Sequence, residues 1–577
     1  MTDVPDPTPA SSAVAPALRE LATALADRAA RASDAAERAA AERLHRHVAE
    51  YLVPRAADLE SPLVVVIVGS TGSGKSSLFN ALAGWPASPS GILRPTTRRP
   101  VVLAAPDDVA ALERGDILPG LSGRGDLHVL ADRRKGRGAG VVLVDAPDID
   151  SIEAENRRLA AELLEAADLL IVITTASRYA DEAPWQMLAR ARERGVPLLA
   201  VLNRLPANDA DAHAVETDYL HLLERAGLLA AGALGQLEIV DIREGQIDPK
   251  RDALSARAIE PVRAALDRLV SGAAERKALA SRALGSALDG LTPAVERIAT
   301  AIEHEREAVE RLERQAAAAY ADELGRLNGE LASGTFLRAE VLRQWQQFVG
   351  AGAVARFLAS GMGRATEAIK GLFRRQPPAP VSEVREGAFT DVVELTAGRA
   401  AEAARRTATE WSTSNLGSRA LADDAGLWTV DPELREALRA DLEEWANAIG
   451  SRITEIGEGK RGFARAASLG VNVLGTATVL AVFTTTGGLT GAELGITAAT
   501  ALLNQKLLEA IFGEATLHQF VSEAREGLRT LIAHRVERDR ARFDATLTGF
   551  APEPDAAAAL RAAAARVEAL RETAAAG

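Results

Sequence analysis

Hydrophobic residues follow two different periods along this chain and divide it into regions of different expected structure. From about Val14 to Ala57 they recur at helical spacing, which predicts helix, at Leu18, Leu21, Leu25, Leu44, Val48 and Leu52. Residues 63–68, LVVVIV, form an unbroken apolar run that is too short for a buried helix, so we expect a central parallel strand. Similar runs follow, most of them separated by helical stretches, at 101–103, 141–144, 169–174, 198–202 and 237–242. This alternation predicts an α/β sheet with right-handed crossovers.

The strand pattern ends near Pro249, and the rest of the chain has the periodicity of long helices. One such helix places apolar side chains on a single face, at Val295, Ile298, Ile302, Val309 and Leu312. We therefore expect a disordered tail over 1–13, an N-terminal helix over 14–58, an α/β domain over 59–250 and a helical stalk over 251–577. The N-terminal helix is expected to pack with the C-terminal helices as a neck beneath the α/β domain.

Composition narrows the class of protein. The chain has 577 residues, too many for one hydrophobic core. Its 67 basic and 80 acidic residues give a net charge of −13, which argues against a general attraction to nucleic acid or anionic lipid. Cysteine is absent, which excludes disulfides and thiolate metal sites and favours the reducing cytoplasm. The first residues, MTDVPDPTPASSA, do not have the pattern of an export signal, so we expect a protein that stays inside the cell.

A glycine-rich motif follows the first expected strand. Residues 69–76, GSTGSGKS, fit the pattern GxxxxGK[ST] between the strand LVVVIV and the helix SSLFNALAG. In such a phosphate-binding loop (P-loop) the glycines turn backbone N–H groups toward the phosphates, and the following helix adds its positive N-terminal dipole. We expect Lys75 to pair with the β and γ phosphates and the Ser76 hydroxyl to bind Mg2+. The predicted phosphate-binding residues are Gly69, Ser70, Thr71, Gly72, Ser73, Gly74, Lys75, Ser76 and Ser77.

Two further polar positions are candidates for the metal site. Asp145 ends the apolar run 141–144, where a carboxylate can complete the coordination of Mg2+. The loop RPTTRRP at 94–100 lies between this run and the P-loop. A threonine there can reach the metal while the γ-phosphate is present and release it after hydrolysis, as switch loops do. We choose Thr97 over its neighbour, so that Ser76, Thr97 and Asp145 are the predicted metal ligands and Lys75, Thr97 and Asp145 the predicted catalytic residues.

The P-loop, the helix end FNALAG, the segment TRRP at 97–100 and DAP at 145–147 together resemble the bacterial dynamin-like GTPases. The resemblance covers about residues 60–245. It implies an α/β P-loop GTPase domain, with a mostly parallel sheet flanked by helices, and a large all-α helical-bundle stalk. It also implies GTP as substrate, Mg2+ as cofactor, and a homo-oligomer or hetero-oligomer with another dynamin-like protein. The implied location is cytoplasmic, peripheral on the inner face of the cell membrane.

The chain departs from the family pattern on the phosphate side. Asp148 stands where the DxPG motif has glycine, and a negative charge near the γ-phosphate is unfavourable unless the loop points it away. Thr71 and Gly72 stand where dynamins carry a glutamine and a serine that help to position water and a monovalent ion. We therefore expect slow intrinsic turnover.

A further departure concerns the base. The family motif [NT]KxD is replaced by Asn203-Arg204-Leu205-Pro206, in which Asn203 is retained and Arg204 can stack on a base through its planar group. Pro206 cannot supply the base-reading carboxylate. Asp209 or Asp211 from a longer loop, or the main chain, remain alternatives, and GTP is preferred over ATP on the resemblance alone. Asn203 and Arg204 complete the predicted nucleotide-binding residues.

Two segments of the helical half are candidates for membrane contact. Residues 466–512 form an apolar hairpin pattern, which indicates either a tip that enters lipid or a hairpin buried in a helical bundle. Residues 348–375 are locally basic and amphipathic, which indicates either a surface for anionic head groups or a solvated helix or loop.

The leading hypothesis is a dynamin-like GTPase in which nucleotide-driven pairing of GTPase domains moves or remodels membrane, with no role for nucleic acid. The alternative is a soluble regulatory or assembly NTPase that acts on a protein or ribosomal partner, with 466–512 as bundle core. A sensor that binds nucleotide and hardly hydrolyses it is a third possibility, motivated by Asp148 and Pro206.

Overall fold

The chain forms two compact units. The first contains Met1–His304 together with Pro552–Gly577, and the second contains Glu305–Ala551. Thr97 and the predicted membrane segments 348–375 and 466–512 lie outside the residues that the structure describes. This structure is a computed structural model, and it describes residues 8–89, 99–122, 126–133, 139–150, 153–194, 196–226, 238–248, 253–333, 381–457 and 514–576.

The first unit is built on a seven-stranded sheet with the strand order β3-β2-β4-β1-β5-β6-β7. All neighbouring strands are parallel except β2 and β4, which run antiparallel, so the predicted mostly parallel α/β sheet is confirmed. Only β3 has no counterpart among the predicted strands of this sheet, because it is short and none of its residues is fully buried. The strands are β1 (Leu63–Val68), β2 (Val101–Ala104), β3 (His128–Ala131), β4 (Val141–Asp145), β5 (Leu169–Thr175), β6 (Leu198–Leu205) and β7 (Glu238–Arg243).

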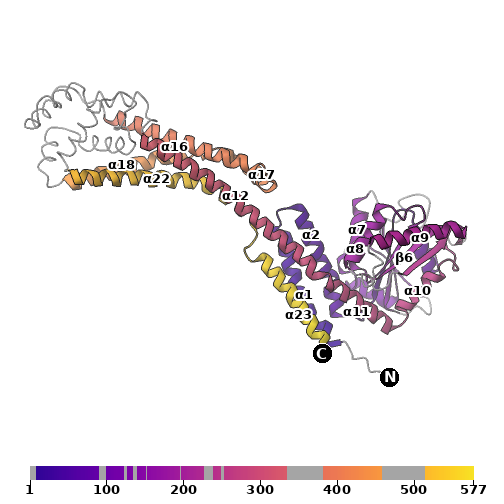
Figure 1. Cartoon of the computed structure of the whole chain (residues 1–577). Helices are drawn as coiled ribbons and strands as arrows, with labels where there is room; N and C mark the ends of the chain where they lie inside the picture. Colours follow the sequence, from indigo (N-terminus) through magenta and orange to yellow (C-terminus); the bar gives the residue numbers. More distant parts are fainter. Residues whose placement is uncertain are drawn as a thin grey trace, which may run out of the picture. The chain divides into compact units, whose positions relative to one another are not determined.

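Helices cover both faces of this sheet (Figure 1). Side chains alternate across a strand, so Val64, Val66 and Val68 of β1 pack into one core and Leu63, Val65 and Ile67 into the other. The first core is covered by α5 (Pro106–Arg114), α7 (Ala154–Ala166), α8 (Glu182–Arg194) and α9 (Asp209–Arg225). The second is covered by α4 (Lys75–Ala83), α10 (Glu260–Val270) and α11 (Ala273–Asp289). Short elements complete the unit: α6 (Pro119–Ser122), β8 (Ile247–Asp248) and β9 (Ala253–Leu254).

The boundary expected at residue 250 differs from the structure. Val262 and Ala265 of α10 and Leu279 of α11 are buried in the second core of the sheet. Helical periodicity gives the apolar face of a helix but not the surface that this face covers. The α/β part therefore continues past the predicted start of the stalk.

The N-terminal region is a broken helix rather than the single helix expected over 14–58. It contains α1 (Thr8–Arg31), α2 (Ala35–Arg46), the π-helix η1 (His47–Leu52) and α3 (Val53–Ala57). The break precedes Asp34, whose side chain caps α2 by accepting hydrogen bonds from the N–H groups of Ala36 and Glu37. α1 begins at Thr8, inside the segment expected as a disordered tail, and packs in one hydrophobic core with α23 (Ala556–Ala576) near the C-terminus.

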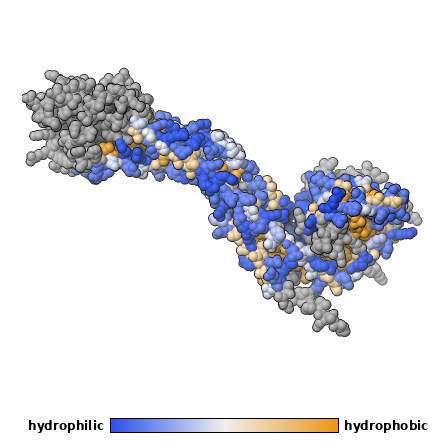
Figure 2. Space-filling view, viewed as in Figure 1, coloured by the Kyte–Doolittle hydropathy of each residue, from blue (hydrophilic) through white to orange (hydrophobic). Residues whose placement is uncertain are grey.

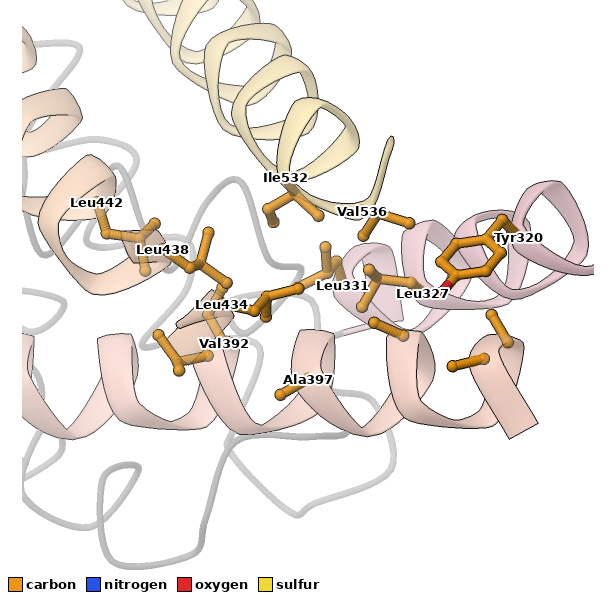
Figure 3. Packing of buried hydrophobic residues seen from close by; sticks show 14 of the residues in the cluster. Tyr320, Leu327, Leu331, Val392, Ala397, Leu434, Leu438, Leu442, Ile532 and Val536 are labelled. Atoms are coloured by element: carbon orange, nitrogen blue, oxygen red, sulfur yellow. The ribbon is translucent and has the colours of Figure 1, made fainter. Parts of the chain in front are cut away.

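The second unit is all-helical. Its elements are α12 (Leu291–Ser333), which begins in the first unit, α16 (Val381–Trp411), α17 (Asn415–Asp423), the 3-10 helix η3 (Ala425–Trp428), α18 (Leu434–Gly457) and α22 (Glu514–Thr548). Figure 3 shows their core, in which Leu327 and Leu331 of α12, Leu438 of α18 and Ile532 of α22 point toward one another. A large all-α helical bundle, separate from the α/β domain, is thus confirmed.

The described surface of both units is largely hydrophilic in the view of Figure 2, with hydrophobic residues scattered among polar ones. None of the helices in the described part of the chain is long and apolar enough to cross a membrane.

Candidate functional site

The P-loop connects β1 to α4 and has the backbone conformation of a phosphate cradle. Gly72 and Gly74 adopt φ values of 77° and 104°, which disfavour any residue with a Cβ atom. A Cβ on Gly69 would collide with the carbonyl oxygen of Ile173, and one on Gly74 would collide with the side-chain amide of Asn203. Three glycines are therefore required by the geometry as well as by the motif.

Lys75 begins α4 and is buried beneath the loop. Its Nζ donates hydrogen bonds to the carbonyl oxygens of Gly69 at 3.0 Å and Ser70 at 3.2 Å. It also forms an ion pair with Asp148, and the Lys75 side chain is only 4% exposed. The loop after β4 thus turns the Asp148 carboxylate toward the P-loop lysine and not away from it.

Asp145 lies at the end of β4 and receives two hydroxyl groups. Ser76 Oγ donates to Asp145 Oδ2 at 2.7 Å and Ser88 Oγ donates to the same oxygen at 2.6 Å. Burial raises the pKa of Asp145 above its ordinary value, while the two hydroxyl groups and Lys75 oppose this shift. Asp145 Oδ1 is buried and has no hydrogen-bond partner among the described residues. A buried carboxylate oxygen without a donor, beside the Ser76 hydroxyl, fits the all-oxygen coordination of Mg2+.

Ser88 was not identified from the sequence. Asn80 of α4 holds it, because Asn80 Nδ2 donates to the Ser88 carbonyl at 2.9 Å and the Ser88 N–H donates to Asn80 Oδ1 at 2.7 Å. The helix end FNALAG thus supports the metal side of the site through Asn80.

A second set of contacts ties the P-loop to the segments after β4 and β5. Asp150 Oδ1 accepts hydrogen bonds from the Thr71 N–H and from Thr71 Oγ1, both at 2.7 Å. Arg178 donates to the Thr71 carbonyl at 2.7 Å and to Asp150 Oδ2 at 3.0 Å, and pairs with Asp181 at 2.7 Å. Although burial acts to raise it, the hydrogen bonds from Thr71 and Arg178 hold the pKa of Asp150 below its ordinary value.

Sequence reasoning missed both Asp150 and Arg178. Asp150 lies two residues after Asp148 in the loop after β4, and this position could have identified it as a site residue. Arg178 lies in no recognisable motif.

The predicted base-binding residues lie at the end of β6. Asn203 is buried, and its Nδ2 donates to the Ser73 carbonyl at 2.8 Å, so it holds the P-loop from the side. Arg204 is exposed and has a φ of 57°, at an irregularity of the strand register. Asp209 begins α9 with a side chain that is 99% exposed and lies 3.7 Å from Arg243, and Asp211 is also exposed.

The remaining P-loop residues lie within the same loop. The hydroxyl groups of Ser70 and Ser73 are buried and have no hydrogen-bond partner within the described ranges, while Ser77 is half-buried. The structure brings together Gly69 to Ser77, Asp145 and Asn203. Thr97 cannot be placed because it falls outside the described residues.

Comparisons with known proteins point to one family. Residues 65–118 match the dynamin family, which confirms the resemblance expected from the sequence. No curated protein matches the chain.

Three solved structures that are similar to this chain have low sequence identity to it. A chain from an oligomerised bacterial dynamin pair, described as sensing and tethering membranes over a long range, is 13% identical with a TM-score of 0.42, covering 94% of this chain and 95% of its own. LeoA, a bacterial dynamin GTPase from ETEC, is 12% identical with a TM-score of 0.24, covering 93% and 98%. Era in complex with MgGDPNP and a segment of 16S ribosomal RNA is 19% identical with a TM-score of 0.25, covering 36% and 56%.

Proposed function

We propose that this chain, a dynamin-like GTPase by the family of its P-loop segment, binds GTP together with Mg2+, hydrolyses it, and uses the nucleotide state to act on membrane. The observation that carries the proposal is that three segments far apart in the sequence meet at one place: the P-loop, the end of β4 and the end of β6. Lys75 lies on the carbonyls of the P-loop, Ser76 donates to Asp145, and Asn203 holds Ser73.

The phosphate end of the site supports triphosphate binding. The Lys75 ammonium is buried at the start of α4, where no side chain caps the first N–H groups of the helix. Phosphate oxygens would accept hydrogen bonds from both kinds of donor. Asp148 holds the same ammonium, so a γ-phosphate must displace this carboxylate from Lys75. Nucleotide binding would thereby move the loop after β4.

Asp145 and Ser76 would hold Mg2+ through the free Oδ1 and the hydroxyl group. When bound, the ion neutralises charge that develops on the phosphates during hydrolysis. Ser88 would hold Asp145 in place for this role. Burial raises the pKa of Asp145, so a bound cation would favour its charged form.

Attack by water on the γ-phosphate requires a group that orients the water. Among the described residues near Lys75, Asp148 and Asp150 are the carboxylates of the loop after β4. Both are engaged, one by Lys75 and the other by Thr71 and Arg178, so slow intrinsic turnover is part of the proposal.

The choice of GTP rests on the family of the P-loop segment. Asn203 is committed through Nδ2 to Ser73 and through Oδ1 to the N–H of Arg204 at 2.9 Å, which fixes the end of β6 beside the P-loop. Arg204 is exposed there and available to stack on a base.

The membrane part of the proposal rests on sequence. Residues 348–375 carry Arg356, Arg364, Lys370, Arg374 and Arg375 against the single acid Glu367, in a chain whose net charge is −13. A local reversal of charge with interleaved apolar residues favours a surface for anionic head groups.

The decisive experiment measures fluorescent-nucleotide binding and phosphate release for the full chain with GTP and with ATP, with and without Mg2+. Lys75→Ala removes the ammonium, and Lys277→Ala is the matched control, since this half-exposed lysine of α11 pairs with Glu60 away from the P-loop. We expect Mg2+-dependent binding and hydrolysis with a preference for GTP, retained in the control and lost in Lys75→Ala. Absence of Mg2+-dependent affinity for either nucleotide would refute the proposal.

Membrane action is tested separately, by flotation of the full chain with liposomes that contain anionic lipid. We expect flotation that depends on nucleotide. A chain that hydrolyses GTP and fails to float in every nucleotide state would instead be a soluble regulatory NTPase.

A further inference from the structure

A cavity of about 250 Å3 in the first unit, away from the P-loop, is open to solvent. Its walls come from α2 and η1 of the N-terminal region, from α7 and α8 of the α/β part, and from the junction of α11 and α12. Most of the lining is alanine, leucine, isoleucine and glycine. The charged and polar side chains that line it are Arg43, His47, Glu165, Arg190, Arg194 and Arg297.

The charges of this cavity are unbalanced. The lining contains one carboxylate, Glu165, and four arginines. Glu165 lies 3.3 Å from Arg194 Nε and 3.5 Å from His47 Nδ1. Burial, together with the charge of Arg194, lowers the pKa of His47 well below its ordinary value, so the imidazole adds no charge. The other three arginines have no acidic partner among the described residues. The lining therefore carries an excess of positive charge in a chain with a net charge of −13.

Arg194 forms the buried end of the cavity. Its side chain is 7% exposed, and its guanidinium lies 5.0 Å from the centre of the Tyr51 ring. Its Nη1 donates to the carbonyl of Leu164, but Nη2 is buried and has no hydrogen-bond partner among the described residues. A buried N–H without an acceptor is unfavourable, so an oxygen that enters the cavity would satisfy it.

We propose that this cavity is a binding site for a small phosphate-bearing anion of about the size of pyrophosphate, held by Arg43, Arg190, Arg194 and Arg297. Guanidinium groups bind phosphate through paired N–H donors, and a phosphate-bearing anion offers oxygens on several sides to arginines from different helices. The volume is just below the ~300–1,000 Å3 of sites for drug-sized ligands, which favours a compact anion.

The site would join three helices of the first unit. Arg43 belongs to α2, Arg190 and Arg194 to α8, and Arg297 to α12. An anion shared by these three helices stabilises their packing, and by linkage the arrangement that binds it best is the one it favours. This role is independent of nucleotide at the P-loop.

Isothermal titration of the full chain with inorganic pyrophosphate tests the site. Lys75→Ala serves as the background, so that the P-loop does not bind the probe. We expect saturable binding in this background and a loss of about tenfold or more in Arg43→Glu/Arg297→Glu, since each change replaces a donor by a repelling charge. The matched control is Arg19→Glu/Arg282→Glu, which alters the same charge at two exposed positions on α1 and α11 outside the lining. The control should bind within about twofold of the background.

Two outcomes would overturn the site. One is the absence of pyrophosphate binding in the Lys75→Ala chain, and the other is equal binding by Arg43→Glu/Arg297→Glu and by the control. The milder variant Arg190→Gln keeps the test usable if the double variant does not fold, as judged by circular dichroism. Its predicted effect is in the same direction, a several-fold weaker affinity with a smaller dependence on salt.

Discussion

At the phosphate end of the nucleotide site, Lys75 is 4% exposed and Asp145 is fully buried, whereas at the base end Arg204 is exposed and the Asp209 side chain is 99% exposed. The phosphate end is built by one strand, one helix and the end of the neighbouring strand β4, so its groups are fixed by elements that the sheet holds rigidly. The base end depends on the loop after β6. For the proposed nucleotide site, this difference predicts that the triphosphate contributes more to the binding affinity than the base does.

The largest effect on nucleotide affinity is expected from substitution of Lys75. Lys75→Ala should weaken nucleotide affinity at least ~100-fold, about 3 kcal/mol, because charged hydrogen bonds to phosphate are lost in a buried setting. Binding of a fluorescent GTP analogue measures this. Comparable affinity of Lys75→Ala and Lys277→Ala would mean that the phosphate end is not the firm part of the site.

The second-largest effect is expected from removal of the Asp145 carboxylate, the proposed Mg2+ ligand. Asp145→Asn should reduce the affinity for Mg2+ in the nucleotide complex roughly 10–100-fold, as loss of a group that orients or ligates a metal does. Titration of phosphate release against Mg2+ checks it. Ser88→Ala removes a hydroxyl bound to the same carboxylate and should shift the Mg2+ requirement less than Asp145→Asn does.

Substitution of Asp148, in the loop after β4, is expected to have a smaller effect, which increases nucleotide affinity. Asp148→Asn and Asp148→Gly should strengthen nucleotide binding up to about tenfold, because the carboxylate no longer competes with phosphate for Lys75. Association and dissociation rates by stopped flow report the change. Weaker binding in both variants would contradict competition and indicate that Asp148 helps to hold the nucleotide.

The smallest effect is expected at the base end. Arg204→Ala should weaken GTP binding about 2–5-fold, since stacking of an exposed guanidinium contributes roughly 0.5–1 kcal/mol. Arg225→Ala, another exposed arginine at the end of α9, is the control. A loss above about tenfold would show that base recognition is firmer than the exposure of Arg204 indicates.

Much of the phosphate end could be predicted from the sequence, because its chemistry is local. The apolar run 63–68 predicts a strand with the same bounds as β1, and the glycine-rich motif directly after it forms the P-loop. Asp145 could be predicted as a metal ligand because it directly follows the apolar run 141–144. Thr97 stays a prediction.

The contacts that could not be predicted join segments far apart in the chain. Arg178 reaches Thr71 only because β5 lies beside β1, and Ser88 reaches Asp145 because Asn80 holds it. The break before α2 had a local signal, Asp34 at the N-cap, which the helical periodicity on both sides concealed. The α/β part extends to α10 and α11, beyond the predicted boundary at residue 250, because an amphipathic helix has the same pattern whether it covers a sheet or another helix.

One continuous helix, α12, carries residues of two hydrophobic cores. Leu291 to Ile302 belong to the core of α1 and α23, and Val309 to Leu331 belong to the core of the second unit. Each residue added to an α-helix turns everything beyond it by about 100°. A single alanine inserted after Val295 would thus turn Ile298 and Ile302 away from the core that they fill in the first unit. The same insertion after Leu312 would turn Ala316 and Leu327 away from the core of the second unit, so each half of this helix tolerates a change of length only at its own expense.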